Sequence, residues 1–226
     1  NRSALFLYDE KSEALERITD QYVDGSSSEY DAENNLIYYT ATLFKTVQPL
    51  KEKLFVYDVA SKQTKQLLDD ELSIHDFKLR QDDILIAGAK TEDYGINENP
   101  QFYTLKNGTL KLALEHDASI GSSVGSDSRF VGGAQTKMHD GNYYFISTID
   151  DGSQLQCLNE DNELSTCVEL KGSVDCFDIA NDTIALVAMN DGQLQELYTY
   201  RGTLEQVSTM NQNILENKYI ADYEPL

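Results

Sequence analysis

The stretch Leu54-Phe55-Val56-Tyr57-Asp58 points to the fold class, because units of the same character recur along the chain. Five copies begin at residues 5, 54, 102, 155 and 197, so successive copies stand 42 to 53 residues apart. A period of about four dozen residues matches one propeller blade, which is built of four antiparallel strands. The repeat therefore predicts an all-β chain that forms a β-propeller or a partial propeller, with about four full blades plus a half-blade.

Other strand-like segments fill each period. Before each of the last four copies lies a short apolar run bounded by Asp, Asn or Gly, as in strands that are buried on both faces. These runs, which we expect to be the second strands of the blades, are 36–40, 84–88, 143–147 and 184–188. Alternating stretches at 75–79 and 174–179 predict first strands with one apolar face. Pairs that tolerate positive φ suit the tight turns and stand at 107–108, 140–141, 151–152 and 191–192.

Helix-forming residues run without interruption only at 12–18 and 211–218. Both segments fall short of the roughly 12 to 15 residues that an isolated helix needs in water. The sequence also lacks Pro-rich linkers and low-complexity tracts, and no apolar run approaches the ~18 residues that would cross a bilayer. We therefore expect residues 1–226 to form a single β-propeller domain.

The charge balance limits the partners that the chain can bind. Lys and Arg number 18 against 39 Asp and Glu, which gives a net charge of -21. A surface this acidic repels phosphate backbones and anionic lipid headgroups. We therefore expect no nucleic acid and no membrane among the partners.

The cysteines indicate a reducing compartment. Cys157, Cys167 and Cys176 are odd in number and contain no C-x-x-C pair, which argues against a disulfide framework. The sequence therefore favours a cytoplasmic location. Because Cys157 and Cys167 flank one predicted hairpin, a disulfide between them is the alternative to two free thiols.

One motif imitates a catalytic site. The segment Gly121-Ser122-Ser123-Val124-Gly125 fits the G-x-S-x-G pattern of α/β-hydrolases, in which the serine sits on a turn between a buried strand and a helix. Here charged residues precede it and Gly132-Gly133 follow it, so neither element is predicted. Only His139 follows as a candidate base. We therefore do not expect Ser123 to be a nucleophile.

No set of residues has the spacing of a metal or cofactor site. His75, His116 and His139 stand far apart, and the acidic clusters lack the spacing of a calcium-binding loop. We therefore expect no metal, no cofactor and no catalytic residue in this chain. A propeller glycosidase, with carboxylates around a central pocket, is a minor alternative; the chain has no Trp for sugar stacking but 14 Tyr.

Two segments resemble a known family. They are 94–103, with the sequence YGINENPQFY, and 117–129, with the sequence DASIGSSVGSDSR, which Gly132-Gly133 follow. They resemble the propeller of prolyl oligopeptidase-family serine peptidases, in the acylaminoacyl-peptidase and dipeptidyl-aminopeptidase branch. Residues 196–198 and the exit from 209–211 to 219–223 are similar to the linker that leaves the propeller for the hydrolase domain.

In that family the propeller is non-catalytic, caps an α/β-hydrolase domain and limits access to short peptides. The resemblance thus implies that this chain is not an enzyme by itself. It implies a piece of a parent serine peptidase of the acylaminoacyl-peptidase or dipeptidyl-aminopeptidase type, whose hydrolase domain would follow residue 226 and whose substrates are peptides. A free-standing propeller that serves as a protein-interaction scaffold is the alternative.

The resemblance also implies two site residues. Asp127 and Arg129 match the family's propeller segment, where an ion pair that fixes a loop is the first expectation and gating of substrate the second. The Gly121-Ser122 step departs from the Gly-Asn of the family at this point.

An open arc of blades would leave strand edges unpaired, so we expect it to close on itself or form a homo-oligomer.

Overall fold

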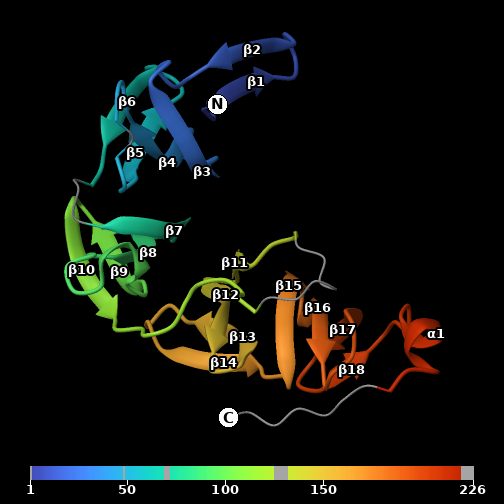
Figure 1. Cartoon of the computed structure of the whole chain (residues 1–226). Helices are drawn as coiled ribbons and strands as arrows, with labels where there is room; N and C mark the ends of the chain where they lie inside the picture. Colours follow the sequence, from blue (N-terminus) through green and yellow to red (C-terminus); the bar gives the residue numbers. More distant parts are fainter. Residues whose placement is uncertain (1, 48, 69–71, 125–131, 220–226) are drawn as a thin grey trace. The chain divides into compact units, whose positions relative to one another are not determined.

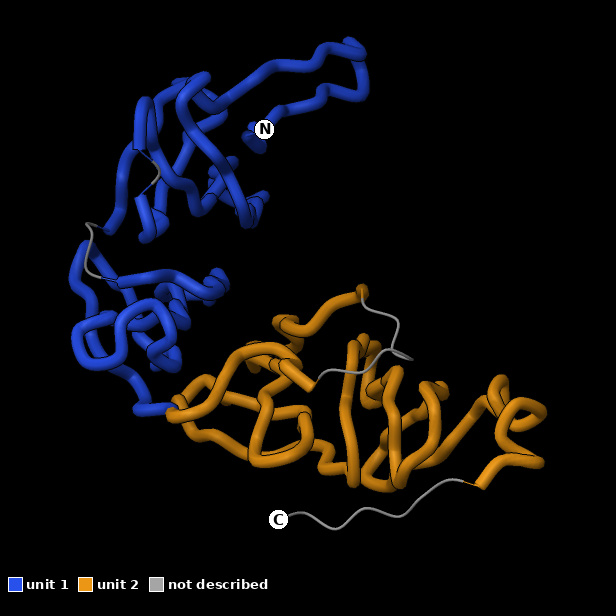
Figure 2. Tube along the Cα trace, viewed as in Figure 1, with its two compact units in different colours: residues 1–116 blue, residues 117–226 orange. Residues whose placement is uncertain are grey.

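The strands of the computed structural model form a two-stranded hairpin, two four-stranded antiparallel sheets, and an eight-stranded sheet that consists of two four-stranded meanders (Figure 1). The structure describes residues 2–47, 49–68, 72–124 and 132–219. The chain separates into two compact units, residues 1–116 and residues 117–226 (Figure 2). The expectation of a single domain stays a prediction, and each unit is described by itself.

Unit 1 contains a hairpin and two sheets in which each strand pairs with the next one along the chain. The hairpin consists of β1 (Phe6–Asp9) and β2 (Ala14–Arg17). The first sheet contains β3 (Val23–Asp31), β4 (Leu36–Leu43), β5 (Lys53–Asp58) and β6 (Gln63–Gln66). The second sheet contains β7 (Ser73–Leu79), β8 (Ile84–Ala89), β9 (Gln101–Lys106) and β10 (Thr109–Leu114), with the 3-10 turn η1 (Gly95–Asn97) before β9.

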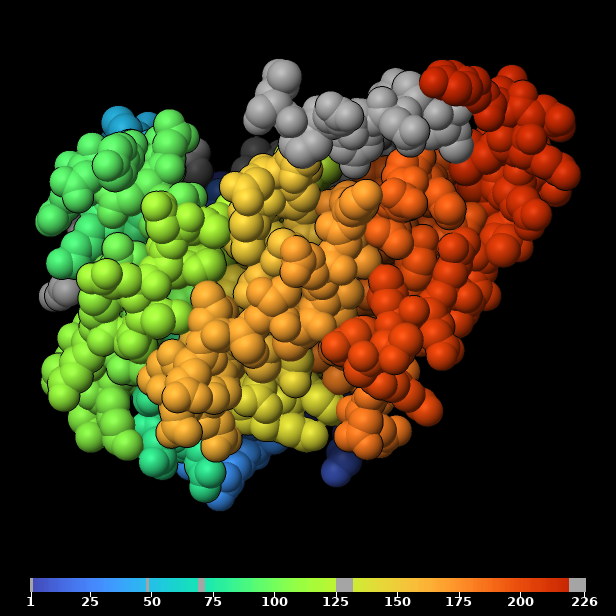
Figure 3. Space-filling view, turned by 90° about the horizontal axis from the view of Figure 1, so that it is seen from below, coloured from blue at the N-terminus to red at the C-terminus, as the bar shows by residue number. Residues whose placement is uncertain are grey.

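Unit 2 contains two meanders of the same kind. The first is β11 (Thr136–His139), β12 (Asn142–Ile149), β13 (Gly152–Leu158) and β14 (Leu164–Val168). The second is β15 (Gly172–Ala180), β16 (Thr183–Asn190), β17 (Glu196–Tyr200) and β18 (Leu204–Gln206), which the short helix α1 (Gln212–Leu215) follows. A single parallel pairing, Ser153 with Ser173, joins β13 to β15. In the space-filling view the last described residues of this unit, in red, continue the surface of its orange strands (Figure 3).

A hydrophobic core lies between the two sheets of each unit. In unit 1 the fully buried Leu54 of β5 packs with Phe77 and Ile86 of the next sheet. In unit 2 Leu155 of β13 packs with Phe177 in the same way. These apolar faces explain why the sheets stack in pairs. Each Å² of apolar surface that is buried away from water stabilises the fold by about 25 cal/mol.

The first strands of two blades share a local irregularity. The ladders of β7 and β15 each contain a β-bulge, at His75 and at Asp175 respectively. In both strands the bulge stands two residues before a buried phenylalanine, Phe77 or Phe177. A bulge adds one unpaired residue and increases the twist of its strand. The repeat therefore extends from the apolar pattern to the backbone itself.

The strand predictions are confirmed. The second strands expected in the four apolar runs are β4, β8, β12 and β16, and the first strands expected at 75–79 and 174–179 are β7 and β15. The five copies of the opening unit form β1, β5, β9, β13 and β17. The all-β fold class, a partial propeller with four full blades and a two-stranded remainder, is thus confirmed.

Three local features differ from the sequence patterns. The helix-forming residues at 12–18 contain strand β2, because pairing with β1 supplies hydrogen bonds that so short a helix would lack. Only four residues of 211–218 form helix. Gly152 begins β13, and the turn before it consists of Asp150, with φ of 52°, and Asp151. The described helices have three and four residues, so neither could cross a membrane.

Candidate functional site

The two site residues expected from the sequence, Asp127 and Arg129, lie in 125–131, outside the described residues. The segment before them, residues 117–124, is described and contains the first four of the five residues of the G-x-S-x-G pattern. We call it the serine loop. Its contacts show what its hydroxyl groups do.

The serine loop is bound to the end of β12. Ser147 Oγ, which is fully buried, donates to the carbonyl oxygen of Ser119 at 2.8 Å, and the amide of Gly121 donates to the carbonyl oxygen of Ile146 at 2.7 Å. Gly121 has φ of 101°, and a Cβ there would stand 2.9 Å from Oε1 of Gln135. The positive φ therefore favours a glycine at this position.

The hydroxyl groups of the imitation motif bind the sheet. Ser123 Oγ donates to Thr148 Oγ1 at 2.9 Å, and the Ser123 amide donates to the same oxygen at 2.8 Å. Ser122 Oγ donates to Ser153 Oγ at 3.2 Å, which donates to the Val174 carbonyl at 2.8 Å. In the described part of the chain no histidine or carboxylate hydrogen-bonds to Ser123. A nucleophilic serine needs such a base, so these contacts favour a structural serine.

A buried carboxylate, that of Asp175, lies on β15 next to these serines. Asp175, at the bulge of β15, is 3% exposed and accepts hydrogen bonds from Ser173 Oγ at 2.9 Å and from Gln195 Nε2 at 2.6 Å. Its carbonyl oxygen accepts from Gln135 Nε2 at 3.1 Å. Because Oε1 of Gln135 accepts from the Ser122 amide at 3.3 Å, Gln135 connects the serine loop to β15. Buried polar atoms need such partners, because an unpaired one costs roughly 1–3 kcal/mol.

A second buried carboxylate binds the segment that leaves the last sheet. Glu196 of β17 is 3% exposed and accepts hydrogen bonds from the amides of Asn211, at 2.7 Å, and Met210, at 2.9 Å. Its other donors are the hydroxyl of Ser208 and the side-chain amide of Asn211. We call this arrangement the exit anchor, defined as Glu196 with residues 208–211.

The electrostatics of the exit anchor favour a charged Glu196. Burial acts to raise the pKa of its carboxyl group, but the donors from Ser208, Asn211 and Met210 outweigh burial and lower the pKa below its ordinary value. Hydrogen bonds to a charged group are roughly twice as strong as those between neutral groups. The departing segment is therefore fixed to the edge of this sheet.

The sequence resemblance had marked both halves of the exit anchor separately, as 196–198 and 209–211. The structure brings them together. No local pattern could show this contact, because two of the four donors are backbone amides, which every residue except proline carries.

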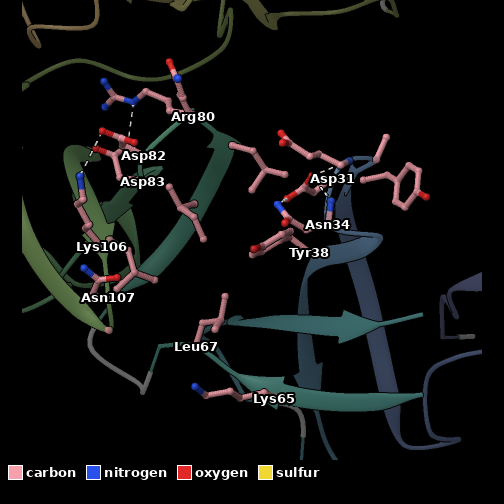
Figure 4. Close-up of a pocket in the computed structure, with 18 residues that line it drawn as sticks. Asp31, Asn34, Tyr38, Lys65, Leu67, Arg80, Asp82, Asp83, Lys106 and Asn107 are labelled. Atoms are coloured by element: carbon pink, nitrogen blue, oxygen red, sulfur yellow. Dashed lines mark hydrogen bonds and ion pairs between the residues drawn. The ribbon is translucent and has the colours of Figure 1, made fainter. Parts of the chain in front are cut away.

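A cavity of about 710 Å³ lies in unit 1 (Figure 4). Tyr38, Leu67 and Leu105 form apolar parts of its lining. Several of its polar side chains pair with a neighbour: the side-chain amide of Asn34 donates to Asp31, and Lys106 and Arg80 form ion pairs with Asp82 and Asp83 respectively. Among the described residues that line it there is no Ser, Cys or His.

The histidines occupy separate places. His116 contacts Phe102 with ring centroids 5.3 Å apart, and Nε2 of His139 lies 3.1 Å from the carbonyl oxygen of Asn181. Among residues 2–47, 49–68, 72–124 and 132–219, no group of three or more His, Cys, Asp or Glu could hold a metal ion.

Comparison with known proteins identifies the fold. The sequence matches no protein-family model and no curated protein. The β-propeller domain of the trilobed protease from Pyrococcus furiosus is 16% identical with a TM-score of 0.64, over 92% of this chain and 62% of that one. The acylaminoacyl peptidase of Pyrococcus horikoshii is 17% identical with a TM-score of 0.69, over 96% and 32%. The dipeptidyl peptidase 4 of Porphyromonas gingivalis is 11% identical with a TM-score of 0.62, over 92% and 36%.

At these identities the likeness concerns the fold, and the chain spans less than two thirds of each matched protein. The acylaminoacyl peptidase represents the branch that the sequence resembles. The chain has the fold of the β-propeller domains of prolyl oligopeptidase-family peptidases, as the resemblance predicted.

Proposed function

We propose that this chain is a non-catalytic propeller segment of a serine peptidase, where it caps an α/β-hydrolase domain and limits entry to short peptides. The observation that carries the proposal is the exit anchor, in a chain whose fold is like that of a peptidase propeller domain. A cap must stand at a defined place over the domain that it covers. A buried carboxylate with four donors fixes where the chain leaves the sheet.

The serine loop supports a non-catalytic chain. The hydroxyl of Ser123 is bonded to Thr148, and Ser122 is bonded to Ser153. Acyl transfer needs a serine next to a base and facing oxyanion donors. In the proposed parent this serine belongs to the hydrolase domain.

The reading frame after Leu226 provides the first test. We expect roughly 250 residues of alternating strands and helices with a G-x-S-x-G between a buried strand and a helix, and then Asp and His in that order. A stop codon shortly after Leu226 in the native gene would contradict the peptidase proposal and favour the interaction scaffold.

Gating is tested in the intact parent with Glu196→Gln, which replaces a carboxylate oxygen by an NH₂ group that cannot accept the donors of residues 208–211. We expect the ratio of kcat/KM for long peptides to kcat/KM for a dipeptide-type substrate to rise several-fold, because the cap is held less firmly. Glu205→Gln, at an exposed position on the next strand, is the matched control. An unchanged ratio in folded, active Glu196→Gln protein would refute gating through this anchor.

A further inference from the structure

Two cysteines meet across one hairpin of unit 2. Cys157 lies on β13 and Cys167 on β14, and none of the three cysteines is in a disulfide. Gln156 pairs with Thr166 and Leu155 with Val168, so Cys167 is the extra residue of a β-bulge. The bulge places Cys167 across the hairpin from Cys157, near enough for the two thiols to interact.

A third side chain completes the arrangement. Tyr144 of β12 pairs with Cys157 on the other side of β13, and its hydroxyl hydrogen-bonds to the thiol of Cys157. Cys157 is 8% exposed and Cys167 is half-buried against the core of the unit. Among the described strands β14 pairs only with β13, so β14 is an edge strand whose local opening would expose both thiols.

The contact between the two thiols shifts their pKa values in opposite directions. The hydrogen bond from Cys167 and that from Tyr144 lower the pKa of Cys157 to about 7, although burial acts in the opposite direction. The same contact with Cys157, together with burial, raises the pKa of Cys167. A thiolate is the reactive form of cysteine, so Cys157 is the nucleophile of the pair and Cys167 its neighbouring thiol.

We propose that Cys157 and Cys167 are an oxidative modification site, at which a peroxide converts the two thiols into a disulfide between β13 and β14. The inference stands independently of the proposed peptidase function. This site differs from a structural disulfide, because its two cysteines are free thiols until they are oxidised. The oxidant is a small molecule of the peroxide class.

The chemistry balances in two steps. The Cys157 thiolate attacks one oxygen of hydrogen peroxide, the O–O bond breaks, and the departing hydroxide takes a proton to become water; Cys157 is now a sulfenic acid. Sγ of Cys167 then attacks the sulfur of Cys157. The S–S bond forms, and the hydroxyl group leaves with the thiol proton of Cys167 as a second water. Two thiols are oxidised by two electrons and one peroxide is reduced.

The test uses the whole chain, reduced and then treated with hydrogen peroxide. After alkylation in denaturant, peptide mass analysis should find Cys157 linked to Cys167, two hydrogen atoms lighter than the reduced pair, and Cys176 alkylated. Dithiothreitol should reverse the link. The rate should rise as the pH increases from about 6 to 8, following ionisation of Cys157. Because this measurement needs no variant, a folding defect cannot obscure it.

Two variants sharpen the result. Cys176→Ser should form the link at an unchanged rate, because Cys176 lies on β15 outside the pair. Cys167→Ser should stop at the sulfenic acid of Cys157, which dimedone traps. The proposal is overturned if Cys157 and Cys167 both remain alkylatable in peroxide-treated native chain, or if Cys157 links to Cys176 instead.

Discussion

Glu196 and Asn211 are 15 residues apart in sequence, yet the carboxylate of Glu196 accepts the backbone amide of Asn211 at 2.7 Å and its side-chain amide at 3.2 Å. Asn211 in turn donates to the carbonyl oxygen of Gln195 at 2.6 Å. Residues 208–211, which follow β18, are therefore connected to the start of β17 through partly buried hydrogen bonds to Glu196 and Gln195. The first two predictions concern this contact.

Replacing Glu196 with Ala should destabilise unit 2. The substitution leaves the partly buried donors of residues 208–211 without their acceptor, which should lower the free energy of unfolding by about 2 kcal/mol. Urea unfolding measures the loss, and limited proteolysis should show faster cleavage near residues 207–212. Glu205→Ala, at an exposed position, should change the free energy of unfolding by less than about 0.5 kcal/mol. Equal effects of the two substitutions would contradict the exit anchor.

The same contact should make stability depend on pH. The folded pKa of Glu196 lies below its ordinary value of 4.5, so the folded chain binds fewer protons than the unfolded chain between these two values. The stabilisation is present above the unfolded pKa and is lost as the pH falls through the folded pKa. Urea midpoints of the native chain and Glu196→Gln should therefore differ at pH 6 and converge in acid. Parallel pH curves would show that Glu196 has an ordinary pKa.

Gly172 should tolerate no side chain. Its φ is 145°, and a Cβ would stand 2.2 Å from the carbonyl oxygen of Met189. Gly172→Ala should therefore lower the free energy of unfolding by about 3 kcal/mol. Gly202 also has positive φ, at 78°, but nothing lies within 4 Å of its Cβ position, so Gly202→Ala should cost about 1 kcal/mol. Thermal unfolding of the two variants measures the difference, and a larger shift for Gly202→Ala would refute the close contact.

Ser123 should not react as a nucleophile. Its hydroxyl is bonded to Thr148, and the described residues place no base beside it. A fluorophosphonate probe should therefore leave this chain unlabelled, and Ser123→Ala in a catalytically active parent should leave turnover nearly unchanged. Stoichiometric labelling that disappears in Ser123→Ala would contradict the non-catalytic proposal.

The regular part of the fold could be predicted from the sequence. The apolar runs at 84–88 and 184–188 identify β8 and β16 because the residues that a strand buries must be apolar. Less regular strands could not be identified in this way. Strand β3 contains Gly25 and three serines and is bulged, and its strand conformation depends on pairing with β4. Residues 14–17 have a helical composition, and pairing with β1 makes them a strand.

The candidate sites show the same division. Sequence resemblance named the segments around Glu196 and Asn211, and residue spacing suggested that Cys157 faces Cys167, but neither showed a contact. Only the tertiary structure decided these two contacts, because strand register and a single bulge residue set which side chains meet. By itself the sequence determined the blade period, the acidic surface and the positions of the apolar strands, since these depend on local composition and alternation. Contacts between distant segments depend on how the strands pair, and that is a property of the folded chain.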